Sequence, residues 1–442
     1  MSAVVVFVAL CTLLVVGKLL RVRIPLLQRF YLPSSVIGGM IGLAVVSFLG
    51  DRLPAQIVES AAKCPGFLIN IIFATIFLGA EIPKFKQVLG FALPQLTLGQ
   101  ILAWGQYVVG LGLAGFAFTR FFDVPVAFGN LLEIGFEGGH GTVGGMAETF
   151  AAYGWEDGVA LGYTVATVGM IVGIVVGMAM IQFAHRRGLV REVKSFKDRR
   201  RYERWGIHLR ASRPSAGLQT VFSDSIDSLA WHIAVVGLAV LVGYGIHHCI
   251  PIEGFPLFPL CMIGGVVLTL GAKLLRTDLL VDRVQMERIS GASLDFLVVS
   301  AVATIRLEVV ARNWQPMAIL VVAGAVWSAG CVFFVAPRIF RTAWFERAIA
   351  EFGQATGVTA TGLMLLRTVD PDNKTPAAMS FGYKQLLHEP VMGGGVWTAL
   401  ALTLVYKIGW FNVFLISLAM LLLWSVVAFV LYRRNLAFGK AL

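Results

Sequence analysis

The chain alternates between long apolar runs and short polar connections. The apolar runs come close to the roughly 20 residues that a helix needs to cross a bilayer. Clear examples are residues 2–17, 37–49, 101–118, 158–184, 228–246, 317–337 and 409–432. The strict alternation of apolar and polar residues that marks transmembrane β-strands does not occur in the sequence. The pattern therefore predicts an all-α polytopic membrane protein.

Glycine, proline and charged residues divide these runs into two sets of five helices and a final helix. The first set is 2–20, 32–50, 66–83, 93–118 and 157–184. The second set is 228–248, 256–275, 291–311, 316–337 and 375–406, and the final helix is 409–432. Two further segments, 124–148 and 346–366, are too rich in glycine and polar residues to cross lipid alone. We expect each of them to form a re-entrant hairpin.

Composition agrees with a membrane protein. Hydrophobic residues make up 57% of the 442 residues and charged residues only 14%, whereas soluble domains carry about 25% charged residues. The five cysteines show no CxxC or Cys/His metal spacing, so they are interpreted as small packing residues. The first apolar run lacks a basic segment before it and a cleavage site after it, so it is expected to be a retained helix.

The distribution of basic residues predicts the topology. If both polar segments enter and leave on one side, 29 of the 36 lysines and arginines lie on one face and five on the other. The rich face is then cytoplasmic, with the N-terminus outside and the C-terminus inside. A full crossing by 124–148 would move the basic segment 186–213 outside and remove this asymmetry. The net charge of +11 thus reflects membrane topology, and no nucleic-acid partner is expected.

The two halves of the chain resemble each other. LPSSVIGGMIGL (32–43) is similar to FPLCMIGGVVLTL (258–270), and FEGGHGTVGGM (136–146) aligns with FGQATGVTATG (352–362). An odd number of spans before the second copy reverses its direction across the membrane. Inverted-topology repeats of this kind are typical of secondary transporters, whose binding sites lie near the bilayer midplane.

The repeats define the predicted domains. Residues 1–184 form the first repeat with its hairpin, and 185–227 form a basic cytoplasmic linker. This linker is interpreted as a solvated loop, with binding of anionic lipid headgroups as the secondary alternative. Residues 228–406 form the second repeat with its hairpin, and 407–442 form a C-terminal transmembrane helix and tail.

The two hairpins carry the candidate site. Glycine allows tight turns, and broken helices direct free N–H groups at anions and free carbonyls at cations. Hydroxyl and carbonyl oxygens suit a desolvated Na⁺, which we expect near Gly138, Thr142, Thr359 and Thr361. A carboxylate at membrane depth is costly and indicates function. The candidate substrate- and ion-binding residues are Glu137, Gly138, Gly139, His140, Gly141, Thr142, Gln354, Thr356, Gly357, Thr359 and Thr361.

A second polar cluster, Lys384, His388 and Glu389, lies in a predicted helix. It either stabilises a broken helix or contacts the substrate. His388 and Glu389 begin an HExxH-like string, but residue 392 is methionine, so the zinc pair is missing. No catalytic residue and no cofactor besides a coupling ion are expected, and the chain is not predicted to be an enzyme.

The hairpin motifs resemble those of the glutamate:sodium symporter family of bacterial secondary transporters. The similar segments are GGHGT (138–142), GVTATG (357–362) and YLPSSVIGG (31–39). The resemblance implies Na⁺-coupled uptake of an acidic amino acid, most often glutamate, across the bacterial inner membrane. It also implies a homodimer in which a mobile domain carries both hairpins past a fixed scaffold.

Some residues depart from the family pattern. Glu137 stands where the family has a small polar residue, and Ala360 stands where it has proline. An extra carboxylate repels a dicarboxylate unless it is protonated or paired with a cation. A proton- or Na⁺-coupled carrier of another carboxylate is therefore an alternative function.

An ion channel is a second alternative, because Thr142–Gly145 is faintly similar to a potassium filter. A filter, however, needs several equivalent loops around one axis.

Overall fold

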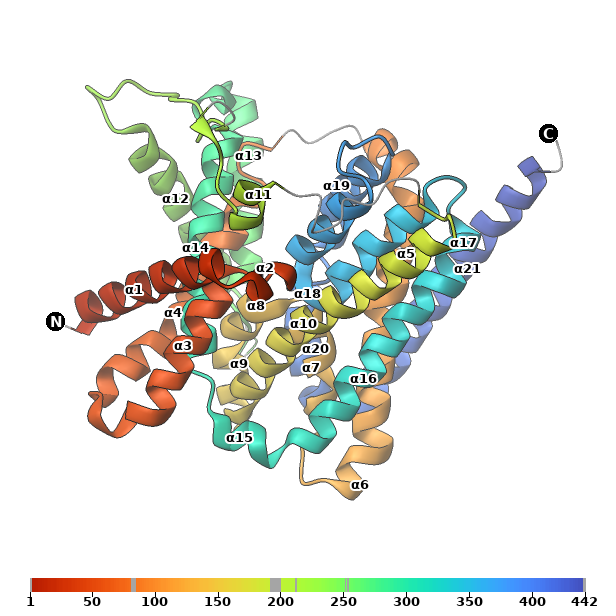
Figure 1. The fold of residues 1–442 in the computed structure, drawn as a ribbon, viewed down its shortest axis with the longest axis horizontal. Helices are drawn as coiled ribbons and strands as arrows, with labels where there is room; N and C mark the ends of the chain where they lie inside the picture. Colours follow the sequence, from red (N-terminus) through yellow and green to blue (C-terminus); the bar gives the residue numbers. More distant parts are fainter. Residues whose placement is uncertain are drawn as a thin grey trace. The chain divides into compact units, whose positions relative to one another are not determined.

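The computed structural model describes residues 2–80, 85–190, 200–210, 213–250, 252 and 254–439. These residues form helices and connecting segments without a β-strand (Figure 1). Eight helical stretches among them are long and apolar enough to cross a membrane: Ala3–Arg23, Ala55–Thr75, Ala92–Phe121, Asp157–Arg186, Ser228–His248, Phe258–Leu275, Trp314–Ile339 and Trp410–Arg434. The predicted multi-pass α-helical class is thereby confirmed. The predicted linker 185–227 is described in part, because 191–199 and 211–212 lie outside the described residues.

The first half of the chain begins with four long helices and ends with one. These are α1 (Ser2–Arg23), α3 (Ser34–Leu49), α4 (Ala55–Thr75), α5 (Phe85–Leu113) and α10 (Asp157–Arg186). A π-helical stretch (Ala114–Phe118) and α6 (Thr119–Phe121) extend α5. The predicted first hairpin contains the short helices α7 (Leu131–Phe136), α8 (Gly139–Gly145) and α9 (Ala147–Ala152). The short helices α2 (Pro25–Arg29) and α11 (Arg201–Trp205) lie in connections.

The second half has a similar order of elements. Its helices are α12 (Ser228–His248), α13 (Phe258–Leu275), α14 (Arg283–Ala303), α15 (Leu307–Arg312), α16 (Trp314–Gly330), α17 (Ala336–Ile339), α18 (Trp344–Val369), α19 (Ala377–His388), α20 (Val396–Lys407) and α21 (Trp410–Gly439). A π-helical stretch (Cys331–Val335) again precedes the predicted hairpin, as Ala114–Phe118 does in the first half.

Several helices differ from their predicted bounds, and for three of the differences the reason can be identified. Helix α14 begins at Arg283 because the Asp282 side chain accepts a hydrogen bond from the Gln285 backbone N–H and caps the helix. Helix α4 begins directly after Pro54, so its polar first turns precede the apolar run. The single helix predicted over 375–406 is two helices, because Pro390 and the glycines at 393–395 follow α19.

Backbone contacts divide the chain into two compact units. Unit 1 comprises Met1–Ile82, His140–Val159 and Arg200–Ile305, and unit 2 comprises Pro83–Gly139, Ala160–Arg199 and Arg306–Leu442. Each unit therefore combines segments from both halves of the chain. The two units are described separately below.

Close helix packing at small residues holds unit 1 together. A Cβ atom on Gly38 of α3 would lie 2.4 Å from the backbone oxygen of Leu13 in α1. In the second half, a Cβ on Gly265 of α13 would lie 2.4 Å from the backbone oxygen of Ala74 in α4. The two similar IGG motifs therefore both serve close helix contacts, as small residues commonly do in membranes.

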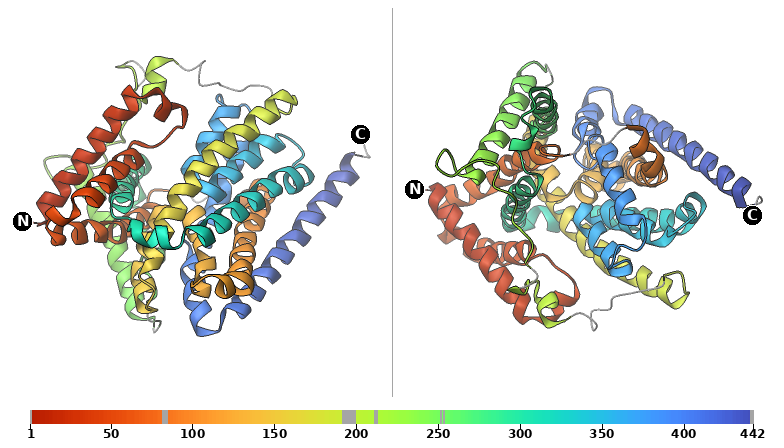
Figure 2. Two further views of the ribbon diagram at one scale, coloured as in Figure 1. Left: turned by 60° about the horizontal axis from the view of Figure 1, so that its bottom comes forward. Right: turned by 90° about the horizontal axis from the view of Figure 1, so that it is seen from above.

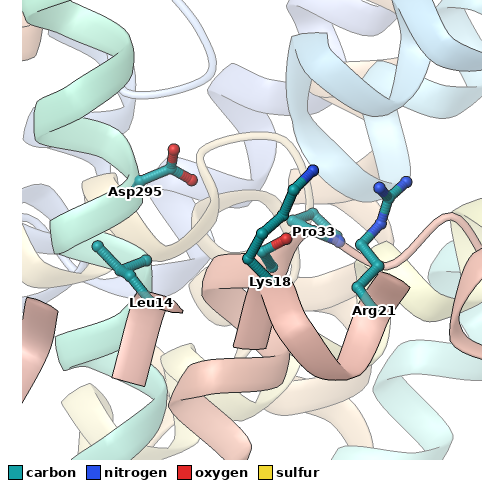
Figure 3. A pocket seen from close by; sticks show the side chains of 6 residues that line it. Leu14, Lys18, Arg21, Pro33 and Asp295 are labelled. Atoms are coloured by element: carbon teal, nitrogen blue, oxygen red, sulfur yellow. The ribbon is translucent and has the colours of Figure 1, made fainter. Parts of the chain in front are cut away.

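Unit 1 also contains a polar pocket with a volume of about 430 Å³. Lys18 and Arg21 of α1 line one side, and Asp295 of α14 lines the other (Figure 3). The Lys18 ammonium donates hydrogen bonds of 2.9 Å to the backbone oxygens of Trp205 and Gly206. Lys18 thereby fixes the end of α11 to α1.

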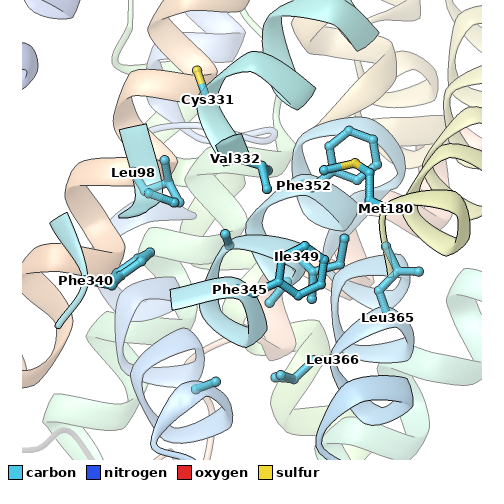
Figure 4. Close-up of a cluster of buried hydrophobic side chains, with 14 of the residues drawn as sticks. Leu98, Met180, Cys331, Val332, Phe340, Phe345, Ile349, Phe352, Leu365 and Leu366 are labelled. Carbon is cyan, nitrogen blue, oxygen red and sulfur yellow. The ribbon is translucent and has the colours of Figure 1, made fainter. Parts of the chain in front are cut away.

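Unit 2 is built around α18, whose apolar side chains fill its core. Phe345, Ile349 and Phe352 come from the first part of α18, and Leu365 and Leu366 come from its second part (Figure 4). They pack with residues of α5, α10 and the α16 region. Helix α5 lies alongside both α16 and α21 (Figure 2). This core holds the two parts of α18 in place and so positions the polar residues between them.

Candidate substrate and ion site

The predicted second hairpin forms a helix broken in the middle. Gly357 and Val358 leave the helical conformation, and Val358 has φ 62° and ψ 171°. A β-branched residue at positive φ is strained, and such strain concentrates at functional sites. The amide of Gln106 in α5 donates a 2.5 Å hydrogen bond to the backbone oxygen of Ala355, just before the break. The break thus leaves backbone carbonyls on one side and N–H groups on the other, within unit 2.

The tips of the two predicted hairpins meet in unit 2. Gly139 has φ +69°, and a Cβ atom there would lie 2.4 Å from Cγ1 of Val358. Beside this contact, Nε2 of Gln354 donates a 3.3 Å hydrogen bond to Oε1 of Glu137. Both the positive φ and the lack of space require glycine at position 139.

Lys384 is a fully buried cation at the centre of the polar network. Its exposed fraction is 0%, and that of its partner Glu351 is 1%. The ammonium lies 3.1 Å from Oε2 of Glu351 and donates a 3.0 Å hydrogen bond to Oε1 of Gln354. The amide of Gln95 in α5 donates to the other oxygen of Glu351 at 2.8 Å. This ion pair joins α18 to α19, and both charges are compensated, as buried charges must be.

A series of hydrogen bonds, each with its donor and acceptor fixed by the one before, leads from α5 to Glu137. The indole N–H of Trp104, which can only donate, bonds to Oε1 of Gln100 at 2.8 Å. The amide nitrogen of Gln100 therefore faces Nδ1 of His388 at 3.1 Å, and that ring nitrogen must accept. The proton of the neutral ring then lies on Nε2, which donates to Oε1 of Glu137 at 2.5 Å. His388 thus donates to the Glu137 carboxyl group from a neutral ring.

Glu133 is fully buried one helical turn before Glu137. Its carboxylate accepts from the Tyr107 hydroxyl at 2.6 Å, the Thr398 hydroxyl at 2.8 Å and the Gly393 backbone N–H at 2.9 Å. Gly393, with φ +66°, lies in the break between α19 and α20. Glu133 therefore fixes the nonhelical segment that follows His388.

Removal of the Glu133 carboxylate should destabilise the protein. Glu133→Ala leaves the buried Tyr107 and Thr398 hydroxyls and the part-buried Gly393 N–H without this acceptor, and each buried donor left unpaired costs about 1–3 kcal/mol. We expect a clearly lower melting temperature for the purified variant than for Tyr107→Phe, which removes only one of the three bonds. Equal melting temperatures for the wild type and Glu133→Ala would contradict this structural role.

One edge of the polar network is less buried than its centre. Thr359, the first residue after the break, donates a 3.0 Å hydrogen bond to Glu389 and accepts one of 3.0 Å from Gln385. Gln385 in turn donates to Gln354 at 2.8 Å. Thr359, Gln385 and Glu389 are half-buried, whereas Gln354 is buried. Thr359, Gln385 and Glu389 are therefore the more exposed edge of the polar network.

Comparison with known proteins identifies the family to which this arrangement belongs. A family model described as Sodium/glutamate symporter matches residues 1–369. The chain belongs to the sodium/glutamate symporter family. It is also 25% identical over 180 residues to the Sodium/glutamate symporter of Haemophilus influenzae, covering 39% of this chain and 42% of that protein. The resemblance predicted from the hairpin motifs is confirmed, and the family is one of transporters rather than enzymes.

The family match ends at Val369, the last residue of α18. Lys384, His388 and Glu389 therefore lie outside the matched region. Glu137 and Glu351 lie inside it. The polar network of this symporter-family chain thus combines two acids from the matched region with a cation and a histidine from beyond it.

The GGHGT motif of this symporter-family chain is divided between the two units. Gly138 and Gly139 belong to unit 2, whereas His140, Gly141 and Thr142 belong to unit 1. All three residues of unit 1 are buried. There a Cβ on Gly141 would lie 2.5 Å from Cδ1 of Ile69, so this glycine makes a close helix contact.

The predicted hydroxyl ligands differ in their surroundings. Thr359 faces the open edge of the network, but the Thr356 hydroxyl is bonded to the Phe352 backbone oxygen within its own helix at 2.7 Å. Thr361 is buried against Gly357 and Gly173. Of the four residues predicted near Na⁺, Gly138, Thr359 and Thr361 lie in unit 2 and Thr142 lies in unit 1. A Na⁺ site at these four residues stays a prediction.

Several network residues were not among the predicted site residues. Polar side chains within the apolar helix α5 were an available signal, because a glutamine in a membrane span must find a partner. For Glu133 the signal was its position four residues before Glu137, on the same helical face. The residues missed are Gln95, Gln100, Tyr107, Glu133, Gln385 and Thr398.

Proposed function

We propose that the chain is a Na⁺-coupled symporter of a small anionic amino acid, with glutamate as the first candidate. Family membership supports this proposal, and the broken α18 beside a buried polar network is the observation that carries it. The second part of α18, from Thr359 to Val369, begins with N–H groups that lack partners within the helix and can bind a carboxylate. Carbonyls before the break and the Thr359 hydroxyl offer oxygen ligands for Na⁺.

Transport is proposed to follow alternating access by an elevator-like motion. Unit 2, which contains α18, the first predicted hairpin only as far as Gly139, and the polar network, is the candidate mobile domain. Two inverted repeats are supported by the similar order of elements and by the π-helical stretch before each predicted hairpin. The hairpins are proposed to be re-entrant, with the N-terminus outside and the C-terminus in the cytoplasm of a bacterial inner membrane. The assembly is proposed to be a homodimer in contact with lipid.

Uptake by purified protein in liposomes tests the function. We expect saturable glutamate uptake driven by an inward Na⁺ gradient at equal pH on both sides. A pH gradient imposed without Na⁺ should drive little uptake. Uptake that follows the pH gradient and ignores Na⁺ would instead support the proton-coupled alternative, and flux that does not saturate would support a channel.

A further inference from the structure

Glu137 has one carboxylate oxygen that the protein leaves unused. The residue is 4% exposed. Its Oε1 receives the hydrogen bonds from His388 and Gln354, while Oε2 is buried and has no hydrogen-bond partner among the described residues. A buried polar atom without a partner costs free energy, and native proteins nearly always satisfy such atoms. Oε2 of Glu137 therefore indicates a hydrogen-bond donor that comes from a bound ligand and not from the described residues.

The charges around Glu137 specify whether that ligand is positively or negatively charged. His388 donates from a neutral ring, so it brings a hydrogen bond but no positive charge to Glu137. The buried cation of the network, Lys384, is bonded to Glu351 and Gln354. Glu137 thus lacks a direct ion-pair partner among the described residues. Since a buried carboxylate needs both a donor and a compensating charge, the ligand is a cationic hydrogen-bond donor.

The same network already shows how it binds an ammonium group. Lys384 places its own ammonium between Oε2 of Glu351 and Oε1 of Gln354, at 3.1 and 3.0 Å. Gln354 also contacts Glu137 through its Nε2. The amide of Gln354 therefore connects the Lys384–Glu351 pair with Glu137. Glu351 contacts the Lys384 ammonium, whereas Glu137 has no ammonium partner of this kind among the described residues.

An ammonium fits Oε2 of Glu137 better than a metal ion does. A hard cation requires several converging oxygen ligands. Within the described part of the chain, no three His, Cys, Asp or Glu side chains come together in a way that could hold a metal ion. The other ligands of the Glu137 carboxylate are N–H groups, whose hydrogens repel a metal ion. An ammonium needs only acceptors for its N–H donors, and one carboxylate oxygen supplies the strongest.

We propose that Oε2 of Glu137 binds the α-ammonium group of the transported amino acid. The inference rests on the proposed function and names the residue that recognises the amino group of its amino-acid substrate. The carboxylate lies at the N–H groups that begin the second part of α18, near Thr359. Thr359 is linked to Glu137 by the hydrogen bonds through Gln385 and Gln354. Glu137 thereby selects amino acids over dicarboxylates of the same length, which lack the amino group.

Competition binding tests this assignment. Radiolabelled glutamate bound to the purified full chain in saturating Na⁺ is displaced by unlabelled glutamate or by glutarate, which has the same carbon skeleton without the amino group. We expect the wild type to prefer glutamate by about tenfold or more, as suits a charge-assisted hydrogen bond. In Glu137→Gln the preference should fall close to one, while glutarate still binds. Glu59→Gln, at an exposed pair with Lys63, is the matched control and should keep the wild-type ratio.

Each other outcome has a distinct meaning. A Glu137→Gln variant that keeps the wild-type preference for glutamate overturns the proposal. A Glu137→Gln variant that keeps the preference but needs much more Na⁺ also overturns the proposal, because Oε2 would then bind Na⁺ and not the substrate ammonium. Binding of glutarate by Glu137→Gln shows that the variant is folded. A wild type without Na⁺-dependent glutamate binding contradicts the proposed function itself, and the inference with it.

Discussion

Replacing Lys384 by methionine is expected to destabilise the protein strongly. The substitution keeps the length and packing of the side chain but removes the charge that compensates Glu351. The 1% exposed Glu351 carboxylate then keeps only the hydrogen bond from Gln95. Breaking a buried ion pair by removing one partner typically costs about 3–5 kcal/mol. A lower melting temperature and a smaller folded fraction of purified protein would report this loss.

The partner residue provides the control. Glu351→Gln in the Lys384→Met background removes the unpaired charge, so the double variant should be more stable than Lys384→Met alone. Lys374→Met, at an exposed pair with Asp372, should change stability by about 1 kcal/mol or less. If Lys384→Met melts at the wild-type temperature, the ion pair does not hold α18 to α19.

Gly139→Leu is expected to abolish Na⁺-driven uptake. The residue has φ +69°, and any Cβ there would lie 2.4 Å from Cγ1 of the strained Val358. A leucine must therefore push the two hairpin tips apart and displace Glu137 from Gln354. Misplacement of a binding residue by about 1 Å costs large factors in rate. Uptake by liposomes, normalised to the amount of folded protein, measures the effect.

Gly154→Leu separates backbone strain from steric conflict. Gly154 has nearly the same φ, +67°, but a Cβ there would meet no atom within 4 Å. This control therefore carries the cost of positive φ alone, about 1–2 kcal/mol, and should retain transport. Comparable uptake by the two leucine variants would show that contact between the hairpin tips is not required.

The sequence allowed the membrane class and most helices to be predicted, because each rests on a local pattern; the re-entrant form of the two glycine-rich segments stays a prediction. Apolar runs of bilayer length identify spans, and glycines with polar neighbours identify segments that cannot lie in lipid. The break after His388 was also marked, by Pro390 and the glycines at 393–395, but the apolar residues on both sides favoured a single helix.

The partners within the site could not be predicted in the same way. Lys384, His388 and Glu389 were recognised as a polar cluster. The partners of Lys384 and His388 could not be recognised, because Glu351 lies on α18 and Glu137 directly after α7. Which acid meets which base depends on how α5, α7, α18 and α19 pack. Tyr107 and Thr398 likewise are ordinary residues of apolar helices until the fold places both against Glu133.

The order in which the network residues occur along the chain has a consequence for biogenesis. Glu137 and Glu351 leave the ribosome before α19, which supplies His388 and Lys384. Until that helix has been inserted, both acids lack their principal partners. The nascent protein therefore has to keep these carboxylates hydrated or protonated until α19 has been synthesised. A stop codon shortly before α19 would produce a truncated membrane protein in which Glu137 and Glu351 lack the partners that α19 supplies. We expect membrane quality-control proteases to degrade such a truncated chain.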